Sequence, residues 1–213
     1  MSFLDKKVIK ELKGVFKDLK KDVTLKYFTQ EMECRFCKET RDLLTELQKV
    51  SDHIKLEIFD FVKDKTEAEK YGVDKIPATL VMDDTDYGIT FYGIPAGYEF
   101  ASLIEAIKLV ASGQHGLQAE TAKFLDGLKK DVRLQVFVTP TCPYCPGAVI
   151  LAHKMAYYSP KVKGDMIEAT EFPHLSQKYN VMGVPRTVID EKNFIEGAAP
   201  ENMVIKKIKA AVK

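Results

Sequence analysis

The chain has 213 residues, 46% of them hydrophobic, which is enough for one large or two small domains with compact cores. Its 32 basic and 31 acidic residues leave a net charge of +1 and are interspersed along the sequence, so a nucleic-acid partner is not expected. No apolar run approaches the roughly 18 residues of a membrane span, so we expect a globular protein without a membrane partner.

The N-terminal segment, MSFLDKKVIKELKGVFKDLKK, interrupts every apolar pair with charges and lacks the apolar core of a secretory signal. We therefore expect a cytoplasmic protein. In that compartment, four cysteines spent on two C-x-x-C pairs favour catalysis or metal binding over a structural disulfide framework. Only four of the basic residues are arginines, leaving 32 − 4 = 28 lysines, a composition that hints at a heat-adapted source.

In the first half, VTLKYFT (23–29) is a short β-branched and aromatic run that predicts a central strand. The pair Cys34 and Cys37 follows it and opens a helix whose apolar residues recur at helical spacing. The remaining elements are a strand at LEIFDF (56–61), a short helix ending at Tyr71, a turn into Pro77, a hairpin from TLVMDD (79–84) to ITFYG (89–93), and an amphipathic helix at YEFASLIEAIKLV (98–110).

The segment ASGQHG (111–116) carries two glycines between helical patterns and predicts the boundary between two domains, residues 1–115 and 116–213. Beyond it, VRLQVFV (132–138) predicts a strand with its valines and leucine on one face, followed by the pair Cys142 and Cys145. The second half then continues with a strand at DMIEATE (165–171), a short helix ending at Tyr179, a turn into Pro185, a hairpin from RTVID (186–190) to NFIEG (193–197), and a helix at ENMVIKKIKAAV (201–212).

The two halves share a sequence pattern. The cysteine pairs are separated by 142 − 34 = 108 residues, and the same shift superimposes YGVDKIPATLV (71–81) on YNVMGVPRTVI (179–189). A shift of 109 superimposes LKKDVTLKYF (19–28) on LKKDVRLQVF (128–137), so one residue was inserted or lost just before the cysteines. Two separate segments thus indicate one duplication.

A C-x-x-C pair at the start of a helix suits thiol chemistry. Unpaired N–H groups and the partial positive charge of a helix N-terminus stabilise a thiolate, so we expect Cys34 and Cys142 at the N-cap positions. The second cysteine, one turn later, is close enough to attack a mixed disulfide and release the substrate. Each pair is therefore expected to form a two-electron dithiol/disulfide couple.

This arrangement resembles the thioredoxin/glutaredoxin superfamily, in which a strand and a C-x-x-C helix precede a proline and a hairpin. In both halves the proline follows the second cysteine by 40 residues (77 − 37 and 185 − 145), and CPYC at 142–145 matches the glutaredoxin tetrapeptide. Two such units in one chain resemble the protein disulfide oxidoreductases of heat-loving archaea and bacteria, also described as glutaredoxin-like proteins. The resemblance covers nearly all of the chain and implies an α/β fold of two tandem thioredoxin-like domains, each a central mixed β-sheet flanked by helices.

The resemblance also implies residue roles. Cys34 and Cys142 would be the partly exposed attacking thiols, with Cys37 and Cys145 as their buried resolving partners. Cis peptide bonds would precede the two prolines, and backbone groups beside them would pair with an extended substrate segment. The residues implied for substrate binding are Ile76, Pro77, Val184 and Pro185.

Thioredoxins usually place a buried acid six residues before the first cysteine, but Phe28 and Val136 occupy those positions here. A proton acceptor must come from elsewhere, and Glu31, Glu33 and Glu168 are candidates by position. Solvated acids or strand-end residues are the competing interpretation of all three.

The residues between the cysteines differ, which predicts different reduction potentials. Arg35 places a fixed positive charge beside Cys34, whereas Pro143 pre-sets the turn after Cys142. Pro146 removes a backbone donor, either distorting the first turn or freeing a carbonyl. Phe36 and Tyr144 are interpreted as apolar rim residues that could contact substrate. The four histidines occupy unmatched positions in the two halves and are interpreted as surface or core residues: His53, His115, His153 and His174.

The expected activity is reduction, formation and isomerisation of protein disulfides by dithiol–disulfide exchange at both sites. The resemblance implies no bound cofactor, protein substrates with thiols or disulfides, and a thioredoxin-reductase-like flavoprotein partner that supplies electrons from NADPH. Use of glutathione and the net direction of electron flow stay open.

Three other interpretations are weighed against this one. An electron relay in a peroxide-reducing system keeps the fold, with one dominant pair passing electrons from a flavoprotein to a peroxidase. A four-cysteine zinc site, or an iron–sulfur cluster bridged between CPYC sites, conflicts with pairs that begin amphipathic helices in well-filled domains. A surface that holds unfolded chains is compatible with disulfide exchange.

Overall fold

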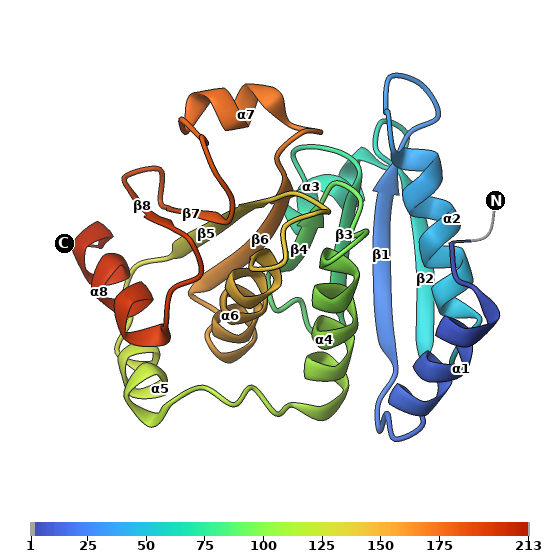
Figure 1. Ribbon diagram of the computed structural model, residues 1–213, viewed down its shortest axis with the longest axis horizontal. Coiled ribbons are helices and arrows are strands. Elements are labelled where there is room, and N and C mark those ends of the chain that lie inside the picture. The colour runs from blue at the N-terminus through green and yellow to red at the C-terminus, as the bar shows by residue number, and fades with distance from the viewer. Residues whose placement is uncertain (1–2, 213) are drawn as a thin grey trace.

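The computed structural model describes residues 3–212 and shows one eight-stranded sheet with helices on both faces (Figure 1). The first half contains α1 (Lys6–Val15), β1 (Val23–Thr29), α2 (Cys37–Gln48), β2 (Ile54–Asp60), α3 (Lys65–Tyr71), β3 (Ala78–Met82), β4 (Ile89–Tyr92) and α4 (Glu99–Ser112). The second half contains α5 (Ala119–Asp126), β5 (Val132–Val138), α6 (Cys145–Tyr158), β6 (Val162–Glu168), α7 (Pro173–Lys178), β7 (Arg186–Ile189), β8 (Asn193–Glu196) and α8 (Glu201–Ala211). Every strand and helix expected from the sequence is present, and α1 is an addition that the sequence analysis did not assign.

The strand order is β2-β1-β3-β4-β6-β5-β7-β8, so each half contributes four strands in the same relative order. The mixed sheet expected for each half is confirmed, and the two sheets are joined edge to edge. Parallel pairing of β4 with β6, from Ile89 opposite Gly164 to Tyr92 opposite Ile167, makes this joint. The boundary predicted between residues 115 and 116 falls in the segment 113–118, which connects α4 to α5.

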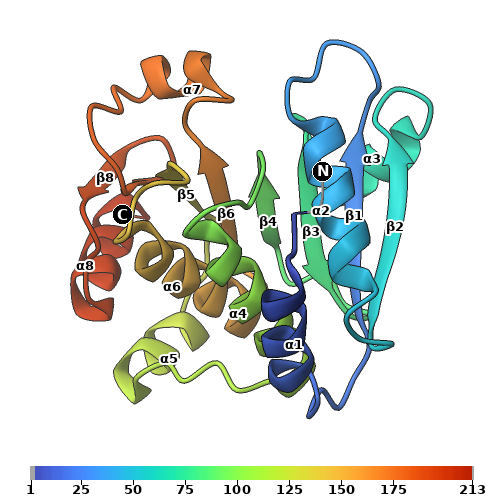
Figure 2. The same ribbon diagram turned by 45° about the vertical axis from the view of Figure 1, so that its right-hand side comes forward.

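Side chains on the two faces of the sheet pack against different helices. One large apolar cluster lines the face covered by α1, α2, α4, α5, α6 and α8, and it contains Val132, Leu134, Val136 and Val138, as their alternation predicted. A smaller cluster on the other face packs under α3 and α7 and includes Phe28 and Phe137. Figure 2 shows α2, α4 and α6 side by side on the first face. Both helices that begin at a cysteine therefore cover the same side of the sheet.

Strand directions place the two cysteine pairs at one edge of the sheet. β1, β4, β6 and β5 all run in the same direction, because β1 pairs antiparallel with β3, β3 antiparallel with β4, and β4 and β5 each pair parallel with β6. The loops after β1 and β5 carry the cysteines and therefore leave the same edge. With strands roughly 4.8 Å apart, the four steps from β1 to β5 separate the sites by about 19 Å.

In the part of the chain that the structure describes, no helix is both long and apolar enough to cross a membrane.

Candidate active sites

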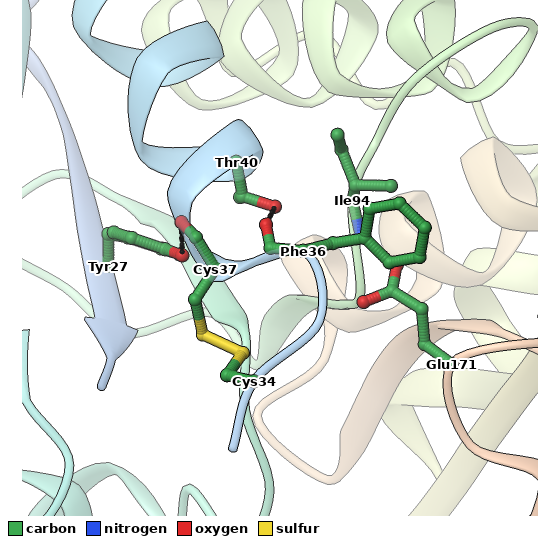
Figure 3. The surroundings of a disulfide bond; sticks show 7 residues. All are labelled: Tyr27, Cys34, Phe36, Cys37, Thr40, Ile94 and Glu171. Atoms are coloured by element: carbon green, nitrogen blue, oxygen red, sulfur yellow. Dashed lines mark hydrogen bonds between the residues drawn. A yellow bond between two sulfur atoms is a disulfide. The ribbon is translucent and has the colours of Figure 1, made fainter. Parts of the chain in front are cut away.

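The first cysteine pair is a disulfide between Cys34 and Cys37 at the start of α2. Cys34 is half-buried and Cys37 is buried. The Tyr27 hydroxyl on β1 donates a hydrogen bond of 2.6 Å to the Cys37 carbonyl oxygen, and burial raises the pKa of Tyr27 to about 12, which keeps this donor protonated. The Thr40 hydroxyl donates to the Phe36 carbonyl at 2.8 Å (Figure 3). Two side-chain hydrogen bonds thus hold the turn that carries the first site.

The second pair is a disulfide between Cys142 and Cys145 at the start of α6. Both cysteines are buried, and Cys142, at 8% exposure, is more covered than the partly exposed thiol that we expected. Tyr144 is 73% exposed, whereas Phe36, its counterpart in the first site, is partly buried against the core. The more accessible cysteine is nevertheless the first of the pair in each half.

The helices begin later than expected. The N-cap residues are Phe36 and Tyr144, so Cys34 and Cys142 lie two residues earlier, in the turn before each helix. Pro146 occupies the second position of α6, where a backbone N–H has no partner within the helix. It therefore removes no helical hydrogen bond, and the distortion weighed from the sequence does not arise.

Both expected cis peptide bonds are present, at Ile76–Pro77 and Val184–Pro185. Pairing of β3 with β1 and of β7 with β5 reaches only as far as Ala78 and Arg186, so Ile76 and Val184 lie outside the paired strands. Each proline sits at the beginning of the strand next to the one that leads to a cysteine pair. Backbone groups beside both disulfides are therefore placed where an extended segment could pair with them.

The acids singled out from the sequence lie in different surroundings. Glu31 and Glu33 are exposed in the loop before Cys34. Glu168 is buried at the end of β6, where Oε2 accepts hydrogen bonds from the Thr170 hydroxyl and the Glu171 backbone N–H, both at 2.7 Å. Glu168 thus closes the turn after its strand, as the strand-end interpretation predicted.

A buried acid beside the second site was missed by sequence reasoning. Glu99, in the first turn of α4, is 1% exposed, and burial raises its pKa to about 7. Ser102 donates to Oε2 at 2.6 Å, while Oε1 is buried without a hydrogen-bond partner among the described residues. The turn before it docks on the loop that leads to Cys142, through the Tyr98 N–H and the Pro140 carbonyl at 2.9 Å. An acid at the start of an apolar helix was the available signal, but an exposed acid is also favoured there.

The four cysteines cannot share one zinc ion, because β3, β4 and β6 separate the strands that lead to them and zinc–sulfur bonds are about 2.3 Å. Among residues 3–212, no group of three or more histidine, cysteine or acidic side chains is arranged to hold a metal ion. The histidines are dispersed: His53 contacts Asp22, His115 lies against Tyr158, His153 is buried against Phe91, and His174 lies near Phe172.

Comparisons with known proteins agree with this geometry. The family model of the thioredoxin domain matches residues 132–210. The crystal structure of a protein disulfide oxidoreductase from Aeropyrum pernix superimposes with a TM-score of 0.91 and 28% identity, covering 99% of this chain and 95% of that one. A structure of the alkylhydroperoxide reductase protein AhpF from Enterococcus faecalis superimposes with a TM-score of 0.89 and 30% identity, covering 97% of this chain and 99% of that one. The chain belongs to the tandem thioredoxin-fold disulfide oxidoreductases.

Curated relatives of this tandem oxidoreductase include longer proteins. The alkyl hydroperoxide reductase protein AhpF of Staphylococcus epidermidis is 29% identical over 171 residues, which are 80% of this chain and 31% of the relative. The Staphylococcus aureus protein of the same name is 30% identical over 175 residues, with the same coverage. The tandem oxidoreductase therefore spans about a third of the length of these relatives. Its chemistry is thiol–disulfide exchange, and its two redox-active disulfides carry that chemistry.

Proposed function

We propose that this tandem oxidoreductase reduces, forms and isomerises disulfides of protein substrates, using Cys34/Cys37 and Cys142/Cys145 as two working sites. The observation that carries the proposal is the repetition of a complete site: each half has an intact cysteine pair at a helix start and a cis-proline loop beside it. A single relict pair would not require the second proline loop.

In the reducing direction, the thiolate of Cys34 or Cys142 attacks one sulfur of the substrate disulfide. A mixed disulfide forms, the substrate S–S bond breaks, and the departing substrate thiolate takes up a proton. Cys37 or Cys145 then loses its proton and attacks the mixed disulfide, which releases the second substrate thiol. The enzyme pair ends as a disulfide, and the substrate has gained two electrons and two protons.

Backbone groups of Ile76 with Pro77, and of Val184 with Pro185, bind the substrate segment in an extended form beside the sulfurs. Strand-like pairing of this kind recognises the backbone, so it suits substrates of varied sequence. Isomerisation follows from the same chemistry when a second substrate thiol resolves the mixed disulfide in place of Cys37 or Cys145.

Glu99 is the proton acceptor that we propose for the second site. It is a buried carboxyl group with one unpartnered oxygen, on the helix whose first turn is docked to the loop before Cys142. A pKa of about 7 allows the group to accept a proton from a thiol and return it near neutral pH.

No bound cofactor is needed for these steps. We propose that a thioredoxin-reductase-like flavoprotein returns electrons from NADPH to the oxidised pairs, and that the protein works in the cytoplasm. Residues 1–115 and 116–213 are the two units that we assign to the two sites.

A redox titration followed by mass spectrometry of each C-x-x-C peptide tests the proposal, in wild type, Cys34→Ser and Cys142→Ser. Insulin reduction and refolding of scrambled ribonuclease report the activity of the same samples. Two separately titrating disulfides, each required for part of the activity, are the expected result. Thiols that resist oxidation, or activity that survives loss of both attacking cysteines, would contradict it.

A second candidate, electron relay to a peroxidase, is favoured by the similarity to alkyl hydroperoxide reductase AhpF over 80% of the chain. Mixing the protein with a flavoprotein reductase, NADPH and a thiol peroxidase would distinguish the two roles. Peroxide-dependent NADPH oxidation that needs only Cys142 and Cys145, with no insulin reduction, would favour the relay.

A further inference from the structure

A second buried acid lies at the seam between the halves, between the two sites. Glu171 follows β6 in the second half, and its Oε1 accepts a hydrogen bond of 2.6 Å from the Ile94 backbone N–H, just after β4 in the first half. Gly93 makes room for it, because a Cβ there would lie 2.8 Å from Glu171 Oε1 and 2.6 Å from Glu168 Cβ. Figure 3 shows Glu171 and Ile94 on the Phe36 side of the first disulfide. A residue of the second half is thus built into the surroundings of the first site.

The groups that act on Glu171 come almost entirely from the first half. Burial raises its pKa to about 7; the Ile94 N–H and the charge of Arg35 lower it, and Glu168 and Glu39 raise it. Glu171 in turn acts on the Tyr27 hydroxyl, which holds the Cys37 carbonyl. Of these groups, Glu168 alone belongs to the second half. The electrostatic partners of Glu171 are therefore mainly parts of the Cys34–Cys37 site.

The duplication shows that this contact is particular to the seam. The position equivalent to Glu171 in the first half is 171 − 108 = 63, where Lys63 is 84% exposed and pairs with Asp60. The first half offers no matching acid from that position. Glu171 is thus a feature that joining the two sheets made useful, and it acts on one site only.

We propose that Glu171 is a positioning residue of the first site, supplied by the other half of the chain, whose charge state sets how strongly Arg35 favours the Cys34 thiolate. The proposal rests on thiol–disulfide exchange at Cys34, the function proposed above. When Glu171 is neutral, the charge of Arg35 acts on Cys34 in full. When Glu171 is ionised, its negative charge offsets that of Arg35, and the thiolate loses stability.

The sign of the effect on the redox equilibrium follows directly. Oxidation of the reduced pair gives a disulfide, two electrons and two protons, and the electrons reduce a partner disulfide to two thiols. A thiolate exists only in the reduced state, so an ionised Glu171 destabilises the reduced state and makes the first site more reducing. At a pH where Glu171 and Cys34 are both protonated, this effect is absent.

The test is equilibration of the full-length protein with dithiothreitol buffers of defined ratio at pH 5.5 and pH 8, with each C-x-x-C peptide quantified by mass spectrometry. Glu171→Gln keeps an oxygen that can accept from the Ile94 N–H but cannot ionise. We expect it to match wild type at pH 5.5 and to shift the first pair about threefold to tenfold toward the dithiol at pH 8. The Cys142–Cys145 pair in the same samples is the internal control, and Glu120→Gln, an exposed acid in α5, is the matched variant.

An equal shift at both pH values would show a structural role and overturn the proposal, as would no shift at pH 8 or an equal shift at the second pair. A wild-type measurement gives the same answer without a variant. Because coupling between two sites is reciprocal, the carboxyl ¹³C resonance of Glu171 must titrate with a higher pKa in the reduced protein than in the oxidised protein. Identical titration in both forms would refute the coupling, whatever substrates the enzyme proves to use.

Discussion

The two cysteine sites occupy equivalent positions in duplicated halves, yet different forces fix their turns. In the first site, hydrogen bonds from Tyr27 and Thr40 hold the carbonyls of Cys37 and Phe36. In the second site the equivalent positions are 27 + 109 = 136 and 40 + 108 = 148, which are Val136 and Ala148 and offer no such donors. The difference teaches that one backbone geometry can be held by side-chain hydrogen bonds or by prolines.

Prolines take over in the second site. Pro143 fixes the backbone dihedral just after Cys142, and Pro146 sits in the first turn of α6, where prolines suit a helix. The surrounding charges differ as well, since Arg35 with Glu171 borders the first site and Glu99 lies next to the second. Two thiol couples with unlike chemistry can therefore work on one rigid sheet.

The largest expected effect comes from removing one attacking sulfur at a time. Cys34→Ser and Cys142→Ser should each reduce exchange at their own site by about 10³-fold or more, because serine is not ionised at neutral pH and is a far poorer nucleophile. Trapping of mixed disulfides, followed by peptide mass spectrometry, measures each site separately. A variant that silenced both pairs would show that the sites depend on each other.

Glu99→Gln should slow exchange at the second site by about 10²-fold near pH 7, because the proton acceptor is lost. In wild type the rate at this site should rise with pH through about 7 as Glu99 ionises, and the variant should lack this inflection. Stopped-flow reduction of a fluorescent mixed-disulfide substrate gives the pH profile. Glu105→Gln, a half-exposed acid on the same helix, is the control.

The same variant should change stability in the opposite sense. The folded-state pKa of Glu99 lies above the ordinary value of 4.5, so its contribution is fully present below pH 4.5 and is lost as pH rises through about 7. Glu99→Gln should therefore be more stable than wild type at pH 8, by roughly 3 kcal/mol at most. Urea unfolding of the oxidised proteins at pH 5 and pH 8 measures the difference, and a gain that is equal at both pH values would contradict burial of an ionisable group as its cause.

Tyr27→Phe removes the hydroxyl that holds the Cys37 carbonyl and leaves a buried acceptor without its partner. We expect a loss of about 1–3 kcal/mol in the free energy of unfolding and a changed redox equilibrium at the first site only. Tyr144→Phe, at an exposed position, should leave stability within about 0.5 kcal/mol. An unchanged first site would mean that the turn is held without this hydrogen bond.

The smallest effect should come from exchanging the residues between the cysteines. Replacing Arg35 by Pro and Phe36 by Tyr installs CPYC in the first site, which removes a positive charge and should change the redox equilibrium constant by about tenfold, or about 30 mV. Equilibration with dithiothreitol buffers measures the shift. If the grafted site then titrates like Cys142–Cys145, the tetrapeptide decides the potential; if it does not, Tyr27, Thr40 and Glu171 do.

Much of the fold could be predicted from local patterns. The predicted strands 23–29 and 132–138 coincide with β1 and β5, and the hairpins follow prolines in cis peptide bonds as expected. Spacing alone identified both cysteine pairs, because a strand, a helix start and a proline loop leave strong local signals. The helix starts were misplaced, because a C-x-x-C turn allows either an N-cap or a preceding turn for its first cysteine.

The joint between the halves could not be predicted from these patterns. Pairing of β4 with β6 depends on two strands 73 residues apart (162 − 89), and a short β-branched run does not specify its neighbour. Glu99 and Glu171 were missed for the same reason, since their burial arises only where the halves meet. In the sequence each resembles an ordinary surface acid.

The ladder between β4 and β6 has a consequence for a broken chain. Each of these strands would be a bare edge without the other, and bare edges pair readily with a matching strand. A protease cut in the segment 113–118 would therefore yield two fragments whose exposed edges complement each other. The fragments should stay associated after the cut, so the molecule contains the interface of a heterodimer that happens to be translated as one polypeptide.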